Sequence, residues 1–222
     1  MEIAYECCND KLPQIYFVGL NILSTSLSKT VCSDDVPESL LNEYIKKFVP
    51  LFIIKISELN LRTRDISMDK LISLFEHPSV DLKILIDNVV DIADGKVPIE
   101  KQQWRIVLAR LEIMILVIGK FGLKEDIWSW RTLCKLLVFP SLNHQNPEVR
   151  GMCIELIMTL YKLIGEDVKN ELIKTKNVKQ SLLQAILDKM KELKVDGGEM
   201  PVQGAAPTNL KEDLTIVEEE RD

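Results

Sequence analysis

The sequence predicts an all-α protein built as an α-solenoid of antiparallel helix pairs, and three observations support this fold class. Apolar residues recur at spacings of three and four along almost the whole chain, and period-two alternation is nearly absent. Glycine and proline are sparse, with nine of each in 222 residues, which favours long helices over a turn-rich β-fold. Arginines open three predicted helices at Arg64, Arg105 and Arg150, and their spacing of 41 and 45 residues is typical of stacked helical repeats.

The helix boundaries follow from periodicity and from capping residues. Pro37 suits the first turn of a helix, and Asn146 followed by Pro147 combines an N-cap with a proline at the first helical position. Gly122 and Gly165 follow apolar runs and suit helix C-caps. We therefore expect helices at about residues 12–30, 38–59, 64–76, 80–93, 99–121, 126–141, 147–164, 167–174 and 177–194.

Two segments share one plan, which is a helix, a short polar turn and a second helix. The segment FVPLFIIKISELNLRTRDISMDKLISL holds Asn60 and Arg62 in its turn, and the segment LCKLLVFPSLNHQNPEVRGMCIELIMTL holds Asn146 and Arg150. Their spacing is that of HEAT or armadillo arrays. A helix pair in such an array buries its apolar stripe only by stacking on its neighbours. The segment between the two, around Trp104, matches this plan less well.

Three regions are expected along the chain. Residues 1–11 are predicted to be a flexible N-terminus that carries Cys7 and Cys8, and residues 12–194 to be the HEAT-like domain. Residues 195–222 form an acidic tail without aromatic residues, which we expect to be mostly disordered from residue 196 on.

The net charge argues against a nucleic-acid-binding protein, and the cysteine content predicts a reducing compartment. The formal net charge is −6, and the eight acids and two bases of the tail account for all of it, so the body is neutral. A nucleic-acid-binding protein would usually be more basic. The five cysteines are odd in number and form no CxxC pair, which predicts a reducing compartment, the cytoplasm. No signal peptide is apparent, and the most apolar run, Ile113 to Ile118, is too short to span a membrane.

No motif in the sequence predicts catalysis, so we expect no enzyme and no cofactor. The two histidines, His77 and His144, stand alone in turns, and no set of four ligands has the spacing of a zinc site. A glycine-rich phosphate loop is also missing from the sequence. The acid pair Asp34–Asp35 beside Pro37 is explained more simply by helix capping than by acid–base chemistry.

In a solenoid of helix pairs, turns within pairs lie on one edge and turns between pairs lie on the other. The turns within pairs together carry a charge of +4, and the turns between pairs carry −8. A basic edge would attract an acidic partner and raise its association rate. The first set is residues 60–65, 94–101, 143–150 and 174–179, and the second is residues 33–38, 76–81, 123–126 and 165–167.

Some of these residues have a structural interpretation as well. An arginine that opens the second helix of a pair is often tied to a nearby carboxylate or carbonyl, and this applies to Arg105 and Arg150. Arg62 lies in the turn itself and is less easily explained this way. Trp104 follows two glutamines near the basic edge and is the better candidate for a surface anchor. Trp128 and Trp130 are expected in the core.

The turns ELNLRTRDISMDKLISL and SLNHQNPEVRGMCIELIMTLY resemble the intra-repeat turns of TOG domains, and the resemblance covers about residues 14–165. TOG domains are HEAT-repeat modules that bind αβ-tubulin through this edge, and the order of segments is similar to the TOG domain of a ciliary-tip protein. The resemblance implies a monomeric module that binds tubulin or the microtubule, at the cytoskeleton and at the centriole or ciliary tip, without nucleic acid, membrane or metal. The tubulin-binding residues that it implies are Asn60, Arg62, Arg64, Lys101, Trp104, Asn146, Arg150, Lys174, Lys176 and Lys179.

Alternatives remain open at this point. TOG domains usually open with a turn whose tryptophan packs on tubulin, and no tryptophan precedes Trp104 here. If the chain begins after the first repeat, an apolar face is expected to be exposed near Tyr16 and Leu20. The second interpretation is a HEAT-repeat scaffold for a protein other than tubulin. The third is a regulatory subunit of an enzyme complex.

Overall fold

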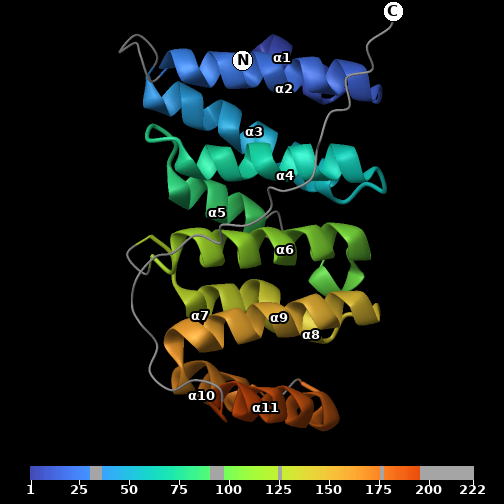
Figure 1. Cartoon of the computed structure of the whole chain (residues 1–222), viewed down its shortest axis with the longest axis vertical. Helices are drawn as coiled ribbons and strands as arrows, with labels where there is room; N and C mark the ends of the chain where they lie inside the picture. The colour runs from blue at the N-terminus through green and yellow to red at the C-terminus, as the bar shows by residue number, and fades with distance from the viewer. Residues whose placement is uncertain (31–36, 91–97, 125–126, 176–177, 196–222) are drawn as a thin grey trace, which may run out of the picture.

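The computed structural model describes residues 1–30, 37–90, 98–124, 127–175 and 178–195, with the backbone alone at residues 29, 30, 100, 194 and 195. Helices stack like rungs along the long axis of the molecule, from α1 and α2 at one end to α11 at the other (Figure 1). The first elements are α1 (Glu2–Cys8), α2 (Pro13–Thr30), α3 (Glu38–Ile56), α4 (Leu61–Glu76), α5 (Leu82–Val90) and the 3₁₀ turn η1 (Ile99–Lys101). They are followed by α6 (Trp104–Phe121), α7 (Trp130–Leu133), the π turn η2 (Cys134–Val138), α8 (Phe139–Leu142), α9 (Pro147–Ile164), α10 (Glu166–Lys174) and α11 (Gln180–Val195).

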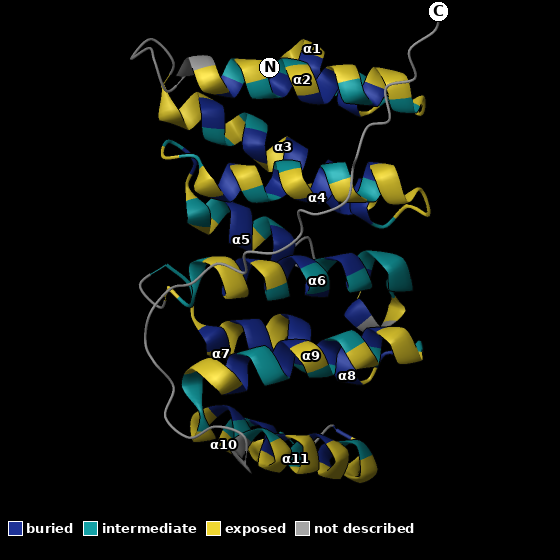
Figure 2. Ribbon diagram, viewed as in Figure 1, coloured by how far each residue is buried: buried dark blue, intermediate teal, exposed yellow. Residues whose placement is uncertain are grey.

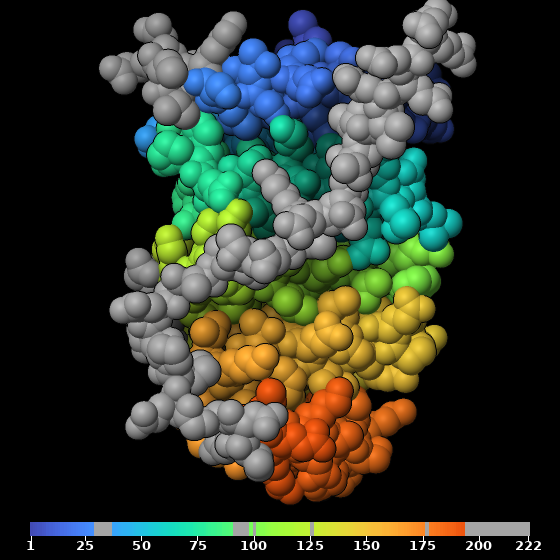
Figure 3. All heavy atoms as spheres, viewed as in Figure 1, coloured from blue at the N-terminus to red at the C-terminus, as the bar shows by residue number. Residues whose placement is uncertain are grey.

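The described helices form two layers, which confirms the predicted all-α solenoid of antiparallel pairs. One layer holds α4, α6 and α9, which pack against one another in succession, and the other holds α3, α5 and the continuous helix α7–η2–α8. The space-filling view shows the successive helices as coloured bands along the long axis, so each repeat lengthens the stack by one band (Figure 3). Within the described residues no helix has the length and apolarity needed to cross a membrane.

The core lies between the two layers, where the buried faces of the helices meet (Figure 2). One face of helix α6 is buried along its length, with Val107, Leu111, Met114 and Ile118 all less than 3% exposed. On its outer face Leu116 is 44% exposed, although the sequence of the helix is apolar on nearly every face. An inner helix of this kind is stable only between neighbouring repeats.

The caps predicted at Asn146, Gly122 and Gly165 are found at helix ends, and Asn60, expected only as a turn residue, is the N-cap of α4. The Asn60 side chain accepts a hydrogen bond from the Thr63 N–H, and the Asn146 side chain accepts one from the Glu148 N–H. Gly122 and Gly165 end α6 and α9 with φ of 71° and 79°, a backbone region in which a side chain would be strained.

The N-terminus corrects a prediction. Residues 2–8 form helix α1, where we expected a flexible segment, and Ala4 and Cys8 are fully buried. The helix packs closely on α2 because Gly19 has no side chain at the crossing. The expected apolar face near Tyr16 and Leu20 is also absent, since α1 packs on α2, Tyr16 contacts Ser67 of α4 and Lys55 of α3, and both residues are at most 1% exposed.

The helix expected at 126–141 also differs from its prediction. It begins at Trp130, extends to Leu142 and contains the π turn η2. Pro140 lacks the N–H that would bond to the Leu136 carbonyl in an α-helix, and a local change of hydrogen-bond pattern accommodates this loss. The expected tail from residue 196 lies outside the described residues.

Candidate functional site

The turns within helix pairs lie on one edge of the solenoid. The α1–α2, α3–α4, η1–α6 and α8–α9 turns face the right side of Figure 1, and the α4–α5, α6–α7 and α9–α10 turns face the left. The turns within pairs and the turns between pairs therefore lie on opposite edges, as expected for a solenoid of helix pairs. We call the first side the intra-repeat edge.

The α3–α4 turn presents the most exposed apolar side chains of this edge. Leu59 is 77% exposed and Leu61 is 68% exposed, on either side of the capping residue Asn60. Arg62 follows, also exposed, with its guanidinium carbon 5.1 Å from the centroid of the Phe17 ring. Arg62 forms no ion pair with any described residue. The turn therefore exposes a cation and two leucines side by side, a combination that is common at protein-binding surfaces.

Lys55 joins this turn to the α1–α2 turn. Its side chain is almost buried, and its ammonium lies 3.1 Å from the Glu58 carboxylate and donates a hydrogen bond to the Asp10 carbonyl at 3.3 Å. It also lies over the Tyr16 ring, 5.0 Å from the centroid. Because a buried charge needs partners, Lys55 has a structural role that holds the two turns together.

Arg64 is structural as well. Its guanidinium forms an ion pair with the Glu112 carboxylate of α6, and both side chains are about a quarter to a third exposed, at 31% and 25%. This ion pair joins the α3–α4 repeat to the next repeat. Arg64 was also predicted to contact a partner, and at 31% exposure it keeps part of its side chain at the surface, so that contact stays a prediction.

The α8–α9 turn is fixed by His144 and Arg150. The buried His144 ring accepts the Asn146 N–H at Nδ1, 3.0 Å away, and its Nε2 lies 3.4 Å from the Gln102 carbonyl, so that the ring bridges two consecutive turns. The Arg150 guanidinium donates to the carbonyls of His144 and Gln145 at 2.8 and 2.7 Å. This is the structural role that the sequence left open for Arg150. Asn146 is likewise occupied as the cap of α9.

The η1–α6 turn carries the remaining candidates of this part of the edge. Lys101 is exposed, and Trp104 is half-buried with the Arg105 guanidinium over its ring at 4.7 Å. No ion pair engages Lys101 or Arg105 within the described part of the chain. Trp130, in contrast, lies in the core as predicted, 2% exposed, whereas Trp128 is only half-buried.

Of the three lysines predicted to form a cluster in the last repeat, the structure describes two. Lys174 ends α10 and Lys179 precedes α11, and both are exposed. Lys176 lies outside the described residues. The cations on this edge that carry no ion pair within the described residues therefore include Arg62, Lys101, Arg105, Lys174 and Lys179.

Sequence reasoning missed four participants of the edge. Leu59 and Leu61 are leucines in an otherwise polar turn. From the spacing of apolar residues alone, they cannot be distinguished from the last apolar residues of a helix. Lys55 and His144 act through neighbours that are distant in the sequence. Around this edge, as elsewhere in the described residues, no group of three His, Cys, Asp or Glu side chains is placed to hold a metal ion.

The described helices form a HEAT-type solenoid whose intra-repeat turns are tied together by polar contacts. Comparison with solved structures supports this class. The structure described as "CEP104 TOG domain" superposes with a TM-score of 0.71 at 14% sequence identity, covering 86% of this chain and 73% of that one. The TOG domain of human Cep104 likewise gives a TM-score of 0.71 at 12% identity, covering 88% and 73%.

These matches confirm the resemblance that the order of segments indicated, which was to the TOG domain of centrosomal protein 104. At such low identity they establish the fold. No protein-family model matches the sequence, and the comparison with curated proteins found no relative.

Proposed function

We propose that this chain is a tubulin-binding module that acts by binding, without catalysis, through its intra-repeat edge. The observation that carries the proposal is the arrangement at the α3–α4 turn, where Arg62 without an ion pair stands beside the exposed Leu59 and Leu61. Exposed apolar anchors next to a cation are typical of protein-binding hot spots. The TOG-like fold supports αβ-tubulin as the partner, because the resemblance implies tubulin binding through this edge.

The edge is built in advance of binding. Lys55, Arg64, His144 and Arg150 hold consecutive turns at fixed positions through contacts within the chain. Arg62, Lys101, Lys174 and Lys179 remain for the acidic surface of tubulin, with Trp104 beside them. Preorganised contacts lose less entropy on association. We place the protein in the cytoplasm, as a monomer at microtubules and at the centriole or ciliary tip.

The test is binding of the full chain to labelled αβ-tubulin by fluorescence anisotropy, with co-pelleting on microtubules as a second assay. Arg62→Glu should weaken binding about tenfold, since one exposed contact is worth about 1 kcal/mol and reversal adds repulsion. Lys124→Glu on the opposite edge is the matched control and should leave binding unchanged. Binding should also weaken as salt rises, because exposed charges are screened beyond about 8–10 Å.

The second candidate is a HEAT-repeat scaffold for an acidic protein other than tubulin. It is favoured by the α1–α2 turn, which exposes Leu12 (57% exposed) and contains no tryptophan, whereas TOG domains usually open with a turn that holds one. A wild-type chain that binds neither free tubulin nor microtubules would exclude the first proposal in favour of this one.

A further inference from the structure

The first helix pair leaves an apolar face uncovered at one end of the stack. Helices α1 and α2 form that end, and no described helix stacks on their outer side (Figure 2). On α2, Val18 is 53% exposed, Ile15 is 36% exposed and Ile22 is half-buried. On α1, Ile3 is 70% exposed. We call these four residues the end face.

The apolar row on α2 has the spacing of a surface that packs against a helix. Its three members lie three and four residues apart and therefore share one face of α2. The other faces of α2 are occupied, since Leu20 lies in the core, Gly19 lies at the crossing with α1, and Phe17 stacks with Arg62. A row with this spacing fits between the side chains of a second helix.

Helix α2 also lacks charge. From Pro13 to Ser28 its sequence contains no charged residue, although its outer side is exposed to solvent. A surface helix normally carries charged or polar residues on its outer side. Depletion of charged residues is the compositional mark of the centre of a protein-binding surface. A helix that covers the end face would therefore bury apolar side chains of α2 and none of its charges.

The opposite end of the stack shows how an outer helix is built for contact with water. Asp188 of α11 is exposed, accepts a hydrogen bond from the Gln184 amide at 3.0 Å, and lies 2.9 Å from the Lys191 ammonium. A polar outer side of this kind is what the terminal repeat of a solenoid needs for solubility. The end face lacks it and has the apolar character of an internal repeat, which stacks on a further helix.

Two acids of α1 indicate the charge of that further helix. Glu2 and Glu6 are exposed one turn apart, before and after Ile3 in the sequence, and neither forms an ion pair with a described residue. Like charges one turn apart repel each other, and a cation beside them relieves the repulsion. We propose that the end face binds an amphipathic helix of another protein, with its apolar stripe on α2 and its basic residues beside Glu2 and Glu6.

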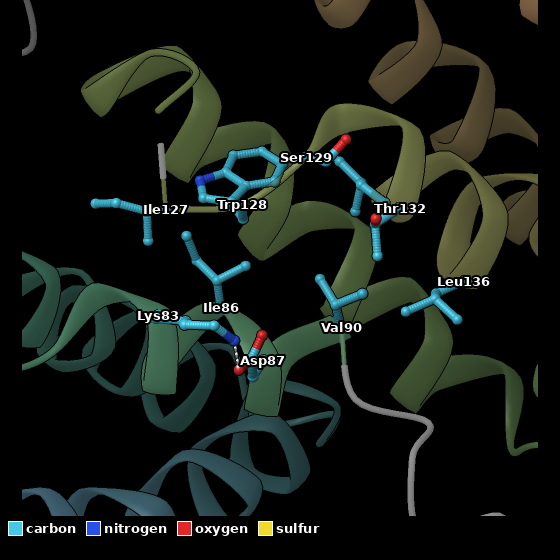
Figure 4. A pocket seen from close by; sticks show the side chains of 10 residues that line it. Lys83, Ile86, Asp87, Val90, Ile127, Trp128, Ser129, Thr132 and Leu136 are labelled. Atoms are coloured by element: carbon cyan, nitrogen blue, oxygen red, sulfur yellow. Dashed lines mark hydrogen bonds and ion pairs between the residues drawn. The ribbon is translucent and has the colours of Figure 1, made fainter. Parts of the chain in front are cut away.

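The pocket between α5 and α7 lacks such selectivity. It is a cavity of about 450 Å³, in which Ile86 and Val90 of α5 lie opposite Trp128 (Figure 4). The charged groups in its lining, Lys83 and Asp87, lie 2.5 Å apart and neutralise each other. The end face differs because its acids are left for a basic partner.

Binding of a synthetic peptide to the full chain tests the proposal. The probe is a fluorescein-labelled helical peptide of about five turns, with leucines at every third or fourth position and lysines along one flank. Val18→Glu should weaken its binding at least about tenfold in fluorescence anisotropy, because an unpaired charge would be buried in the interface. Leu116→Glu is the matched control, since Leu116 is another exposed apolar residue, 44% exposed on α6.

An exchange of charge tests the basic flank of the partner. Glu6→Lys should weaken binding of the lysine peptide about fivefold, since it replaces an attraction by a repulsion at an exposed site. The same variant should bind more tightly than the wild-type chain to a peptide with glutamates in place of the lysines. Equal affinity of the wild-type chain for the two peptides would overturn the basic partner.

Three further results would overturn the proposal. The first is a wild-type chain that binds the lysine peptide no better than a peptide of the same composition in shuffled order, which has no stripe. The second is wild-type affinity in Val18→Glu, or in Ile15→Glu if Val18→Glu lowers the melting temperature. The third is a wild-type dimer in sedimentation equilibrium that Val18→Glu converts to a monomer, because a second copy would then cover the end face.

The proposal is separate from tubulin binding. The end face lies on the outer side of α1 and α2, whereas the intra-repeat edge is formed by the turns. Val18→Glu should therefore bind tubulin as the wild-type chain does, and Arg62→Glu should bind the lysine peptide as the wild-type chain does. Each assay can fail without affecting the other.

Discussion

The Arg64 guanidinium on α4 forms an ion pair with the Glu112 carboxylate on α6 and thereby joins two consecutive repeats. Arg62, two residues earlier, points to the edge and stacks on Phe17. Positions two apart on a helix face in different directions, so that neighbouring arginines of one turn have separate roles. We therefore expect a substitution of Arg64 to change the stability of the stack and a substitution of Arg62 to change only the binding that we propose for this edge.

We expect Arg64→Ala and Glu112→Ala each to lower the free energy of unfolding by about 1–3 kcal/mol. Either change leaves the remaining partner of a partly buried pair without its counter-charge. The melting temperature should fall by about 2–4 °C per kcal/mol in a protein of this size. The double variant should lose less than the sum of the two, as measured by a double-mutant cycle from urea unfolding. Arg62→Ala is the control, and a loss of stability there equal to that of Arg64→Ala would contradict the division of roles.

Much of the fold could be predicted from the sequence because local signals and global packing agree. The 3.6-residue period and the caps at Asn146, Gly122 and Gly165 placed most helix ends within a few residues. Helix α1 was missed because seven residues with two buried positions give too short a pattern to separate from a loop.

The roles of the charged residues could not be predicted in the same way. The sequence shows that Arg62 and Arg64 lie at a turn, but the partner of Arg64 is 48 positions away. Likewise, nothing local indicates that His144 reaches the Gln102 carbonyl, 42 positions away. Contacts between repeats depend on how the helices stack. The 3.6-residue period predicts that the helices stack, but it does not predict which residues of neighbouring helices face each other.

The crossing of α1 and α2 gives a second prediction. A Cβ at Gly19 would lie 2.7 Å from both the backbone nitrogen and the Sγ of Cys8, so that the two helices would have to separate. Gly19→Ala should therefore destabilise the protein by about 1–3 kcal/mol.

Gly151 provides the matched control for this substitution. It is exposed within α9, and a Cβ there would meet nothing within 4 Å. Gly151→Ala should stabilise the protein by about 0.5–1 kcal/mol, because alanine is the better helix former. Thermal unfolding of both variants checks the pair, and equal effects would argue against close packing at Gly19.

The leucines of the α3–α4 turn should contribute to binding and not to stability. Leu59→Ser and Leu61→Ser remove side chains that are 77% and 68% exposed, so the melting temperature should change by less than about 2 °C. Together they should weaken tubulin binding about tenfold or more, since burial of one leucine is worth about 1.5–3 kcal/mol. Leu163→Ser, on α9, is the control in the same anisotropy assay. A double variant with wild-type affinity would remove the apolar anchor from the proposed interface.

The last prediction concerns alkaline pH. Burial raises the pKa of Cys8 and of Cys134 to about 12, and burial raises the pKa of Cys153 well above its usual value. In the unfolded chain these thiols lose their protons near pH 8.5. Above that pH the folded state therefore binds more protons than the unfolded state, and stability falls as pH rises.

Each such thiol should lower the free energy of unfolding by about 1 kcal/mol between pH 8.5 and pH 9.5, because half of the unfolded thiols are already ionised at pH 8.5, and three thiols together should lower it by about 3 kcal/mol. Burial also raises the pKa of Tyr16, whose contribution begins only above its ordinary value near 10, so this window isolates the thiols. Urea unfolding at pH 7.5, 8.5 and 9.5 measures the slope. The double variant Cys134→Ala and Cys153→Ala should retain about one third of it. A wild-type slope no steeper than that of the double variant would show that the two thiols titrate alike in the folded and unfolded states, and hence that they are not buried as described.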